Sequence, residues 1–260
     1  MAVPPDSFAP AAPLTAMIFA AGRGERMRPL TDACPKPLLP VAGKALIVWQ
    51  IERLAGAGFA RIVINHAWLG ERIEAALGDG SRWGVDLRYS AEPDALETAG
   101  GIAQALPLLE PEGRPLAFVA VAGDIYTDFD YRTLLPHIAR AREDAASGAA
   151  PRMHLVMVPN PPYHPHGDFA LEGTRLLLTD PLAEPLADRP RYTFASFGVY
   201  DTRMFHDIPP GTRLALRPYY LSAIERGRAS GELYLGRWEN IGTPEQLAAL
   251  DRDLCAANPT

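Results

Sequence analysis

Apolar and polar positions follow two different periods along the first 150 residues of the chain. Short apolar or β-branched runs such as "AMIFA" (16–20) and "RIVINHA" (61–67) predict strands. Between them, "ALIVWQIERLAGAG" (45–58) places its apolar residues roughly at helical spacing before a glycine stop, which predicts a helix. The run "PLAFVAVAGD" (115–124) is almost continuously apolar, as expected for a buried central strand of a parallel sheet.

The other segments extend this alternation of strand and helix. The further strands expected are "VDLRYS" (85–90), "RMHLVMV" (152–158), "GDFALEG" (167–173) and "RYTFASFGVYD" (191–201). The further helices expected are "GERIEAALG" (70–78), "GGIAQALPLL" (100–109), "RLALRPYYLSAIERGR" (213–228) and "TPEQLAALDRDL" (243–254). The pattern predicts an α/β fold, Rossmann-like with three α/β/α layers around a mixed, mostly parallel sheet. We expect a second lobe after residue 150 that adds to the same sheet.

Composition and charge narrow the class of protein. The 260 residues can bury one sizeable core, and 48% hydrophobic with 22% charged residues is an ordinary globular composition. A net charge of -6 argues against a nucleic-acid partner, which needs a basic face. Only two cysteines are present, so we expect a reducing compartment, the cytoplasm. No apolar run is long enough to span a membrane, and residues 1–12 are expected to form a disordered tail.

The segment from Met17 to Lys44, "MIFAAGRGERMRPLTDACPKPLLPVAGK", concentrates positive charge. Its five cations against two carboxylates give a local charge of +3 in a chain of -6. The loop begins where a predicted strand ends, which is where ligands bind in open α/β sheets. Gly22 and Gly24 would let backbone N–H groups approach an anion and adopt positive φ angles. We therefore expect a polyphosphate site surrounded by the cations Arg23, Arg26, Arg28 and Lys36.

The common nucleotide motifs do not fit this loop. Met27 stands where a dinucleotide fingerprint has its third glycine, and Lys36 follows Gly24 by twelve residues, too far for a Walker A loop. From the residues alone, turn chemistry for the glycines and a solvated face for the arginines stay open. Prolines on both sides of Lys36 would nevertheless hold its ammonium in a limited region.

Other candidate residues lie near strand ends and in turns. Asp124 ends the buried apolar run, so its carboxylate should reach the same sheet edge as the glycine loop, although a strand-end Asp is often only a turn residue. His164 and His166 form an H-x-H pair without an evident third ligand, which disfavours zinc. Tyr200 is a candidate for stacking on a sugar, although strand aromatics are more often core.

Two blocks, "AAGRGERMRPLT" (20–31) and "PKPLLPVAGK" (35–44), resemble the signature of the sugar-1-phosphate nucleotidylyltransferases. "ALETAGGI" (95–102), "AGDI" (122–125) and "WENIGTPEQL" (238–247) follow in the family's order, so the resemblance covers about residues 14–250. The stretches "INHAWLGERIEAALGDG", "ETAGGI" and "HPHGDFAL" are more similar to the N-acetylmuramate-1-phosphate uridylyltransferases than to the mannose-1-phosphate guanylyltransferases. The resemblance implies the nucleotidyltransferase fold in a single domain over 13–260, with nucleotide bound by 13–150 and sugar by 151–260.

The implied reaction is Mg²⁺-dependent transfer of a uridylyl group from UTP to a sugar 1-phosphate. N-acetylmuramate α-1-phosphate would give UDP-N-acetylmuramate and pyrophosphate in peptidoglycan recycling. A mannose-1-phosphate guanylyltransferase remains an alternative, and so does a subunit that senses nucleotide sugars without turnover. No nucleic acid or membrane partner is implied, and we expect a monomer or a dimer, since the C-terminal β-helix of the trimeric relatives is missing.

The resemblance also assigns roles to residues. Arg26 would bind the departing pyrophosphate, Lys36 the α-phosphate and the sugar phosphate, and Asp124 the Mg²⁺. The implied nucleotide-binding residues are Ala20, Ala21, Gly22, Gly24, Glu92, Thr98 and Gly100, and the implied sugar-binding residues are Gly167, Asp168 and Tyr200.

Three departures from the family's pattern stand out. Asn240 occupies the second metal position, where many relatives have Asp, and Thr243 with Gln246 would form a helix capping box beside it. Ala122 stands where relatives often carry Asn, and "HPHGDFAL" lacks the Glu-Lys-Pro element of glucose-type relatives. Asn240 and Ala122 are the departures that would permit a subunit that senses nucleotide sugars without turnover.

Overall fold

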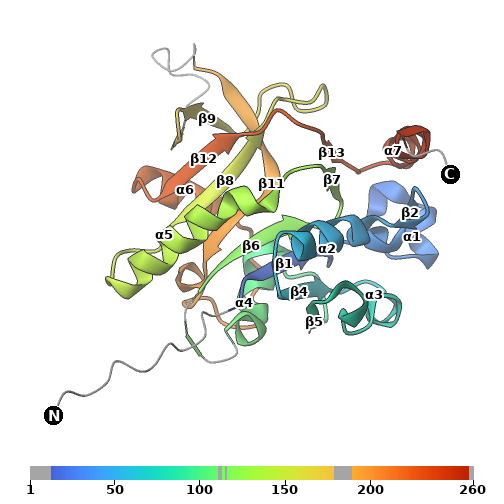
Figure 1. Cartoon of the computed structure of the whole chain (residues 1–260), viewed down its shortest axis with the longest axis horizontal. Helices are drawn as coiled ribbons and strands as arrows, with labels where there is room; N and C mark the ends of the chain where they lie inside the picture. Colours follow the sequence, from blue (N-terminus) through green and yellow to red (C-terminus); the bar gives the residue numbers. More distant parts are fainter. Residues whose placement is uncertain (1–12, 111–112, 115, 179–188, 258–260) are drawn as a thin grey trace.

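The computed structural model describes residues 13–110, 113–114, 116–178 and 189–257. The expected N-terminal tail, residues 1–12, lies outside this range. Nine of the described strands form one large sheet in the order β5-β4-β1-β6-β11-β8-β12-β10-β9 (Figure 1), and β2 with β3 and β7 with β13 form two separate pairs. Strands from both parts of the chain therefore share a single sheet.

The first half of the chain contributes parallel strands. These are β1 (Thr15–Phe19), β4 (Arg61–His66), β5 (Asp86–Ala91) and β6 (Ala117–Ala122). Each is paired in parallel with its neighbour in the sheet. The apolar runs seen in the sequence become the buried centre, because Met17 and Ile18 point to opposite faces and both are fully buried.

The second half of the chain makes the sheet mixed. Its strands are β8 (Met153–Val158), β9 (Phe169–Glu172), β10 (Arg175–Leu177), β11 (Arg191–Asp201) and β12 (Ala229–Leu233). β11 lies antiparallel between β6 and β8, β12 runs parallel to β8, and β9 and β10 pair antiparallel at the far edge. Parallel pairing thus prevails in the first half only.

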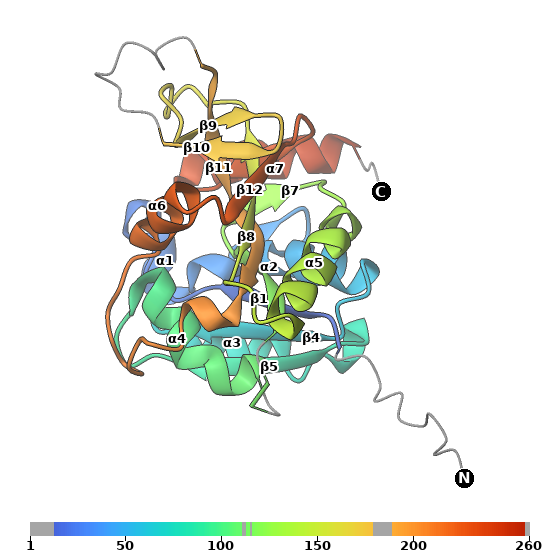
Figure 2. The same cartoon turned by 90° about the vertical axis from the view of Figure 1, so that its left-hand side faces the viewer.

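Helices cover both faces of the sheet (Figures 1 and 2). α2 (Leu46–Gly56), α3 (Gly70–Leu77) and α5 (Leu135–Ala146) pack on one face, in the hydrophobic cluster that includes Ile18 and Val121. α4 (Glu97–Leu109) and α6 (Arg217–Glu225) pack on the other, in the cluster that includes Met17 and Tyr200. The three-layer arrangement predicted from the sequence is confirmed. None of the described helices is both long and apolar enough to cross a membrane.

A third hydrophobic cluster joins the C-terminal helix to the glycine-loop segment. Leu247, Leu250 and Leu254 of α7 (Pro244–Ala257) pack with Met27 and Leu46. The short elements around this cluster are α1 (Leu30–Ala33), β2 (Pro40–Val41), β3 (Lys44–Ala45), β7 (Ile125–Thr127) and β13 (Trp238–Asn240). Short 3-10 helices lie at η1 (Glu25–Met27), η2 (Lys36–Leu38), η3 (Ser81–Trp83), η4 (Tyr131–Leu134) and η6 (Thr202–Met204). The C-terminal helix is therefore held against the segment that follows the glycine loop.

Two sequence predictions are wrong in detail. The helix expected over 213–228 is restricted to α6, because residues 213–216 run along the start of α4, where Leu214 N donates to Leu96 O at 2.9 Å. β12 and β13 were not predicted as strands. In β12, Gly231 lets the strand pack closely on Leu176 of β10, since an added Cβ would lie 2.9 Å from its side chain.

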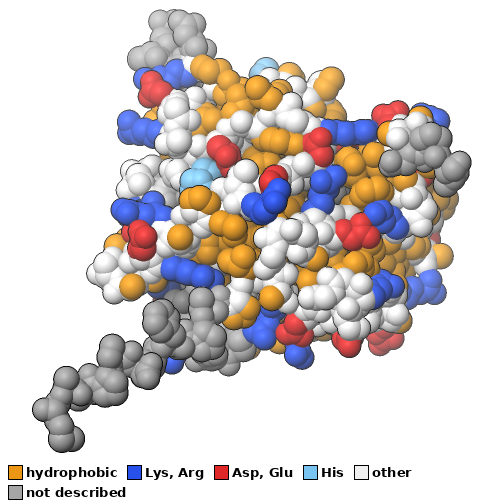
Figure 3. Space-filling view, in the orientation of Figure 1, with side chains coloured by type: hydrophobic (Ala, Val, Ile, Leu, Met, Phe, Trp, Pro, Cys, Tyr) orange, Lys and Arg blue, Asp and Glu red, His pale blue; other side chains and the backbone are white. Residues whose placement is uncertain are grey.

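Charges are distributed evenly on the face shown in Figure 3. Basic and acidic side chains of the described residues are interspersed there with hydrophobic ones, and neither sign forms a continuous patch.

Candidate active site

A cavity of about 620 Å³ opens where β1 and β6 end. Its walls come from the glycine loop after β1, the start of α4, the end of β6, β11, α6 and the turn before α7. This volume is in the range of small-molecule sites, and the location beyond the carboxyl ends of parallel strands is the usual one in open α/β folds. The predicted residues that line it are Ala20, Ala21, Gly22, Gly24, Arg26, Lys36, Thr98, Asp124 and Tyr200.

The two loop glycines serve different purposes. Gly24 has φ +69°, and a Cβ there would lie 3.1 Å from Lys36 Cβ, so both its backbone and its close packing favour glycine. Gly22 is not among the residues with positive φ, which corrects that expectation. A Cβ at Gly22 would meet nothing within 4 Å, so the backbone there is open toward the cavity.

Lys36 and Asp124 form an ion pair at the edge of the cavity. Lys36 Nζ lies 2.5 Å from Asp124 Oδ2, and the two side chains are 10% and 35% exposed. Lys36 begins the short η2, between Pro35 and Pro37, and these prolines restrict its backbone as expected. Asp124 follows the Gly123 turn at the end of β6, where Gly123 N donates to Phe19 O. The end of β6 is thus tied to the end of β1.

Of the five cations in residues 17–44, Arg26 and Lys36 line the cavity. Arg23 instead lies over the Trp68 ring, 4.0 Å from its centroid, and Arg28 pairs with Asp32 at 2.7 Å. The expectation that Arg23 and Arg28 surround the phosphate site is therefore not met. Arg28 lies between η1 and α1, where the chain turns, and Arg23 packs on Trp68, so nearness in sequence to the glycines does not place either side chain in the cavity.

Asp124 and Asn240 are brought together by the pairing of β7 with β13. Asn240 pairs with Ile125 in this antiparallel ladder, and Ile241 N donates to Asp124 O at 2.9 Å. The buried Asn240 Oδ1 has no hydrogen-bond partner among the described residues. The backbones of the two residues are thus adjacent, and a carboxylate together with an amide oxygen is the kind of donor set that a hard divalent cation takes. Asn240 itself is not among the residues that line the cavity.

The capping box predicted after Asn240 is confirmed. Thr243 N donates to Gln246 Oε1 at 3.0 Å, and Gln246 N donates to Thr243 Oγ1 at 3.3 Å. Gly242 N also donates to Gln246 Oε1, at 2.7 Å. The start of α7 therefore fixes the backbone just after Asn240 and beside Arg26, since a Cβ on Gly242 would lie 3.2 Å from an Arg26 guanidinium nitrogen.

Asn65, which the sequence reading missed, connects two walls of the cavity. Its Oδ1 accepts from Ala20 N at 3.0 Å, and its Nδ2 donates to Glu92 Oε1 at 2.7 Å. Glu92 Oε2 accepts in turn from Leu96 N at 2.8 Å. Burial raises the pKa of Glu92, against the opposing effect of these hydrogen bonds. Glu92 lies behind the cavity lining, where it holds the loop before α4. The sequence did offer a signal for Asn65, because it is a polar residue near the end of the apolar run 61–66.

The start of α4 contains strained backbone at the cavity. Glu97 has φ +59°, lines the cavity, and pairs with Arg213 at 3.3 Å. Ser196 also lines the cavity with φ +63°, at the register shift of β11 against β8. Positive φ in non-glycine residues costs about 1–3 kcal/mol each and is concentrated at functional sites. Neither Ser196 nor Arg213 was found from sequence.

Gly100 packs against a neighbouring loop and does not line the cavity. Its N–H donates to Leu214 O at 3.0 Å, and a Cβ would lie 2.1 Å from Thr212 O. Glycine is therefore required here for the loop at 212–214 to approach α4. That loop in turn carries Arg213 to the cavity.

The residues predicted to bind the sugar fall into two groups. Tyr200 lines the cavity, and its hydroxyl lies 3.1 Å from that of Tyr220, another lining residue. Burial raises the pKa of both phenols, so both stay protonated at neutral pH. Gly167 and Asp168 lie outside the lining, where Asp168 Oδ2 accepts from Phe194 N at 2.8 Å and so positions a residue of the wall.

Comparisons with known proteins agree with this site. The profile of the nucleotidyl transferase family matches residues 15–256. An N-acetylmuramate alpha-1-phosphate uridylyltransferase from Neisseria meningitidis serogroup B is 48% identical over 88% of this chain and 94% of its own length. A protein of the same name from Caulobacter vibrioides is 31% identical over 95% of this chain and 99% of its own length.

A likeness also exists among solved structures. A proposed glucose-1-phosphate thymidylyltransferase from Bacillus anthracis, in complex with a sucrose, superposes with a TM-score of 0.74. The match is 22% identical and covers 95% of this chain and 97% of the other. At this identity the likeness concerns the fold, and it confirms the predicted fold class.

Proposed function

The chain belongs to the nucleotidyl transferase family, and from this we propose that it transfers a uridylyl group from UTP to N-acetylmuramate α-1-phosphate. The products are UDP-N-acetylmuramate and pyrophosphate, as needed in peptidoglycan recycling. The observation that carries the proposal is the meeting of the glycine loop, Arg26, Lys36 and Asp124 in one cavity. The high identity to a uridylyltransferase over most of both chains supports this substrate pair over the guanylyl alternative.

The chemistry requires an anionic sugar phosphate to attack the α-phosphorus of an anionic triphosphate. Proximity, in-line alignment and charge neutralisation supply the catalysis, with no covalent intermediate on the protein. Lys36 binds the α-phosphate and the incoming sugar phosphate as a compact charge. Arg26 takes the departing pyrophosphate, because its planar guanidinium matches two phosphate oxygens at once. The backbone at Gly22 and Gly24 contacts the nucleotide.

A divalent cation, Mg²⁺, would be held by Asp124 and Asn240. It would supply positive charge that offsets the negative charge of the phosphates. The pairing of β7 with β13 keeps the Asp124 and Asn240 backbones adjacent before any ligand arrives. Asn240 contributes an oxygen without charge. Lys36 and Arg26 therefore have to neutralise the negative charge of the phosphates.

The remaining predicted residues are proposed to act on the base and the sugar. Ala20, Ala21 and Thr98 contact the nucleotide from the cavity wall, and Glu92 and Gly100 support it from behind. Tyr200 contacts the sugar, and Gly167 with Asp168 hold the wall on that side. We therefore keep residues 13–150 as the nucleotide-binding part and 151–260 as the sugar-binding part of one domain. The cytoplasm and a monomeric or dimeric state stay predictions.

The proposal is tested by measuring pyrophosphate release with Mg²⁺. UTP, GTP, dTTP, CTP and ATP are crossed against the 1-phosphates of N-acetylmuramate, N-acetylglucosamine, glucose and mannose. Release confined to UTP with N-acetylmuramate 1-phosphate is the expected result. A signal with GTP and mannose 1-phosphate would keep the chemistry and overturn the substrate. Nucleotide binding without release across the panel would favour the sensing subunit, for which Ala122 and Asn240 are the residues to restore first.

A further inference from the structure

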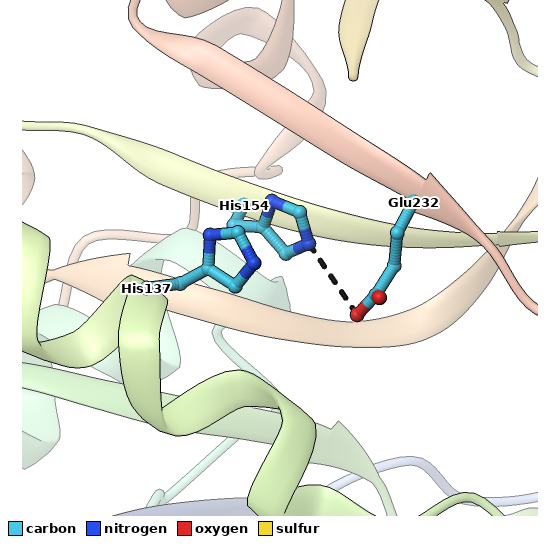
Figure 4. Close-up of side chains that lie close together, drawn as sticks. All are labelled: His137, His154 and Glu232. Atoms are coloured by element: carbon cyan, nitrogen blue, oxygen red, sulfur yellow. Dashed lines mark ion pairs between the residues drawn. The ribbon is translucent and has the colours of Figure 1, made fainter. Parts of the chain in front are cut away.

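Three side chains from distant parts of the chain meet on the face of the sheet covered by α5 (Figure 4). His137 comes from α5, His154 from β8 and Glu232 from β12. One ligand atom from each lies within 4.8 Å of the other two. None of the three lines the active-site cavity. His154 pairs in register with Val199, so it lies on the sheet face opposite to that of Tyr200.

Two polar atoms of this cluster are buried without a hydrogen-bond partner among the described residues. They are His154 Nε2 and Glu232 Oε1, which face each other as a histidine–carboxylate pair 3.5 Å apart, without a hydrogen bond (dashed line in Figure 4). A buried polar atom left unpaired costs about 1–3 kcal/mol, so its presence calls for an explanation. Two ligands of one tetrahedral metal at bond lengths of about 2.0–2.1 Å lie about 3.3–3.4 Å apart. The observed separation is close to this value.

A neighbouring side chain holds the His154 ring in an orientation suited to a metal ligand. Its Nδ1 lies 2.9 Å from Ser230 Oγ, on the neighbouring strand. A hydrogen bond to one ring nitrogen fixes the ring and its tautomer, and leaves the other nitrogen facing Glu232 for a metal. Histidine ligands in metal sites almost always have such a second partner.

His137 completes the cluster from the helix side. Its ring stacks on that of His154 with 3.4 Å between centroids and 12° between planes. Because an imidazole binds a metal in the plane of its ring, the His137 ring would turn out of this stack when both histidines bind one ion.

We propose that His137, His154 and Glu232 bind a divalent transition metal of the zinc class. Two imidazoles and one carboxylate are the ligands that this class prefers, and three protein ligands leave a fourth position for water. The cluster lies close to the surface, because the Glu232 side chain is 34% exposed and His137 is only partly buried. The ion would tie α5 to β8 and β12, and β12 leads through residues 234–237 into β13, which carries Asn240.

Co²⁺ binding to the full-length protein tests the proposal directly, because tetrahedral Co²⁺ absorbs visible light strongly. The titration is run in excess Mg²⁺, which competes for the oxygen ligands Asp124 and Asn240. One Co²⁺ per chain, displaced by Zn²⁺, is expected for the wild type. His137→Ala and Glu232→Gln should each weaken binding by about 100-fold. His206→Ala is the matched control, since it removes another histidine paired with a carboxylate, Glu110 at 3.0 Å.

Thermal unfolding supplies a second measurement. Zn²⁺ at roughly 100 times its dissociation constant should raise the Tm of the wild type and of His206→Ala by about 5 °C or more, and leave His137→Ala unchanged. Circular dichroism of the metal-free variants establishes that they fold. Absence of the Co²⁺ band in the wild type, or equal binding by His137→Ala and Glu232→Gln, would overturn the site. Neither result bears on uridylyl transfer, which is measured separately.

Discussion

Lys36 Nζ lies 2.5 Å from Asp124 Oδ2, across 88 residues of sequence. In the chain without ligands, the cation proposed for the phosphates thus neutralises the carboxylate proposed for the metal. Breaking such a partly buried pair without replacement leaves uncompensated charge. In the proposed reaction, the substrate phosphate would take the place of the carboxylate beside Lys36, and Mg²⁺ would take the place of the ammonium beside Asp124. The ion pair thus joins the proposed phosphate-binding cation to the proposed metal ligand.

Replacing Lys36 by Ala should reduce turnover far more than nucleotide affinity. The ammonium acts where charge develops during transfer, and removal of one such group typically lowers kcat by about 10²–10³-fold. We expect the Kd for UTP to change by no more than about threefold. Steady-state pyrophosphate release and equilibrium UTP binding measure the two quantities.

Lys44→Ala is the matched control for this experiment. Lys44 belongs to the same basic segment but pairs with Glu52 and lies over the Trp49 ring, outside the active-site cavity. It should retain nearly full turnover. A Lys36→Ala enzyme that turns over at the wild-type rate would remove Lys36 from the proposed mechanism.

Arg26 and Arg28 allow a comparison within one loop. Arg26 lines the cavity, whereas Arg28 is exposed and pairs with Asp32. Arg26→Ala should lower kcat/KM for UTP by about 10²-fold, because it removes a charge-assisted contact to pyrophosphate. Arg28→Ala should change it by less than about threefold, since exposed ion pairs contribute little. Comparable losses in both variants would show that the loop acts only through its overall charge.

The sequence predicted the part of the fold that depends on local pattern. The apolar run before the glycine loop encodes β1 because Met17 and Ile18 can both be buried, one on each face. β12 escaped prediction because "ASGEL" has no apolar alternation. Its strand conformation is imposed by pairing with β8 and by the close packing of Gly231 on Leu176, neither of which is visible in a single segment.

The same distinction applies to the candidate site. Arg26, Lys36 and Asp124 were identifiable because they belong to contiguous motifs at a strand end. Ser196 and Arg213 reach the cavity only through a β11 irregularity and a loop that packs on α4, so their position depends on tertiary contacts. Arg23 and Arg28 show the opposite error, since nearness in sequence to the glycines did not bring them to the cavity.

Asn240 should control the requirement for Mg²⁺. Asn240→Asp adds a charged oxygen beside Asp124 and should lower the Mg²⁺ concentration for half-maximal activity by about tenfold. Asn240→Ala removes the unpartnered Oδ1 and should raise it. Titration of pyrophosphate release with Mg²⁺ in the three proteins measures this order. If all three share one half-saturation point, Asn240 is not a metal ligand.

Alanine substitutions at Gly22 and Gly100 should separate an effect on nucleotide binding from an effect on the stability of the fold. A Cβ at Gly22 would meet nothing within 4 Å of the protein, and the residue has no positive φ. Gly22→Ala should therefore leave stability within about 0.5 kcal/mol of the wild type. The methyl group would stand where the backbone approaches the triphosphate, so the KM for UTP should rise about tenfold.

Gly100→Ala should lower stability and leave the KM for UTP nearly unchanged. Its Cβ would lie 2.1 Å from Thr212 O, a backbone atom that cannot move without shifting the loop at 212–214. Overpacking of this kind costs about 1–3 kcal/mol, which corresponds to a Tm lower by several degrees in a domain of this size. Thermal unfolding and UTP saturation are measured on both variants. A normal KM with a lowered Tm in Gly22→Ala would contradict the open approach to the nucleotide, because it would show that the space beside Gly22 serves packing alone.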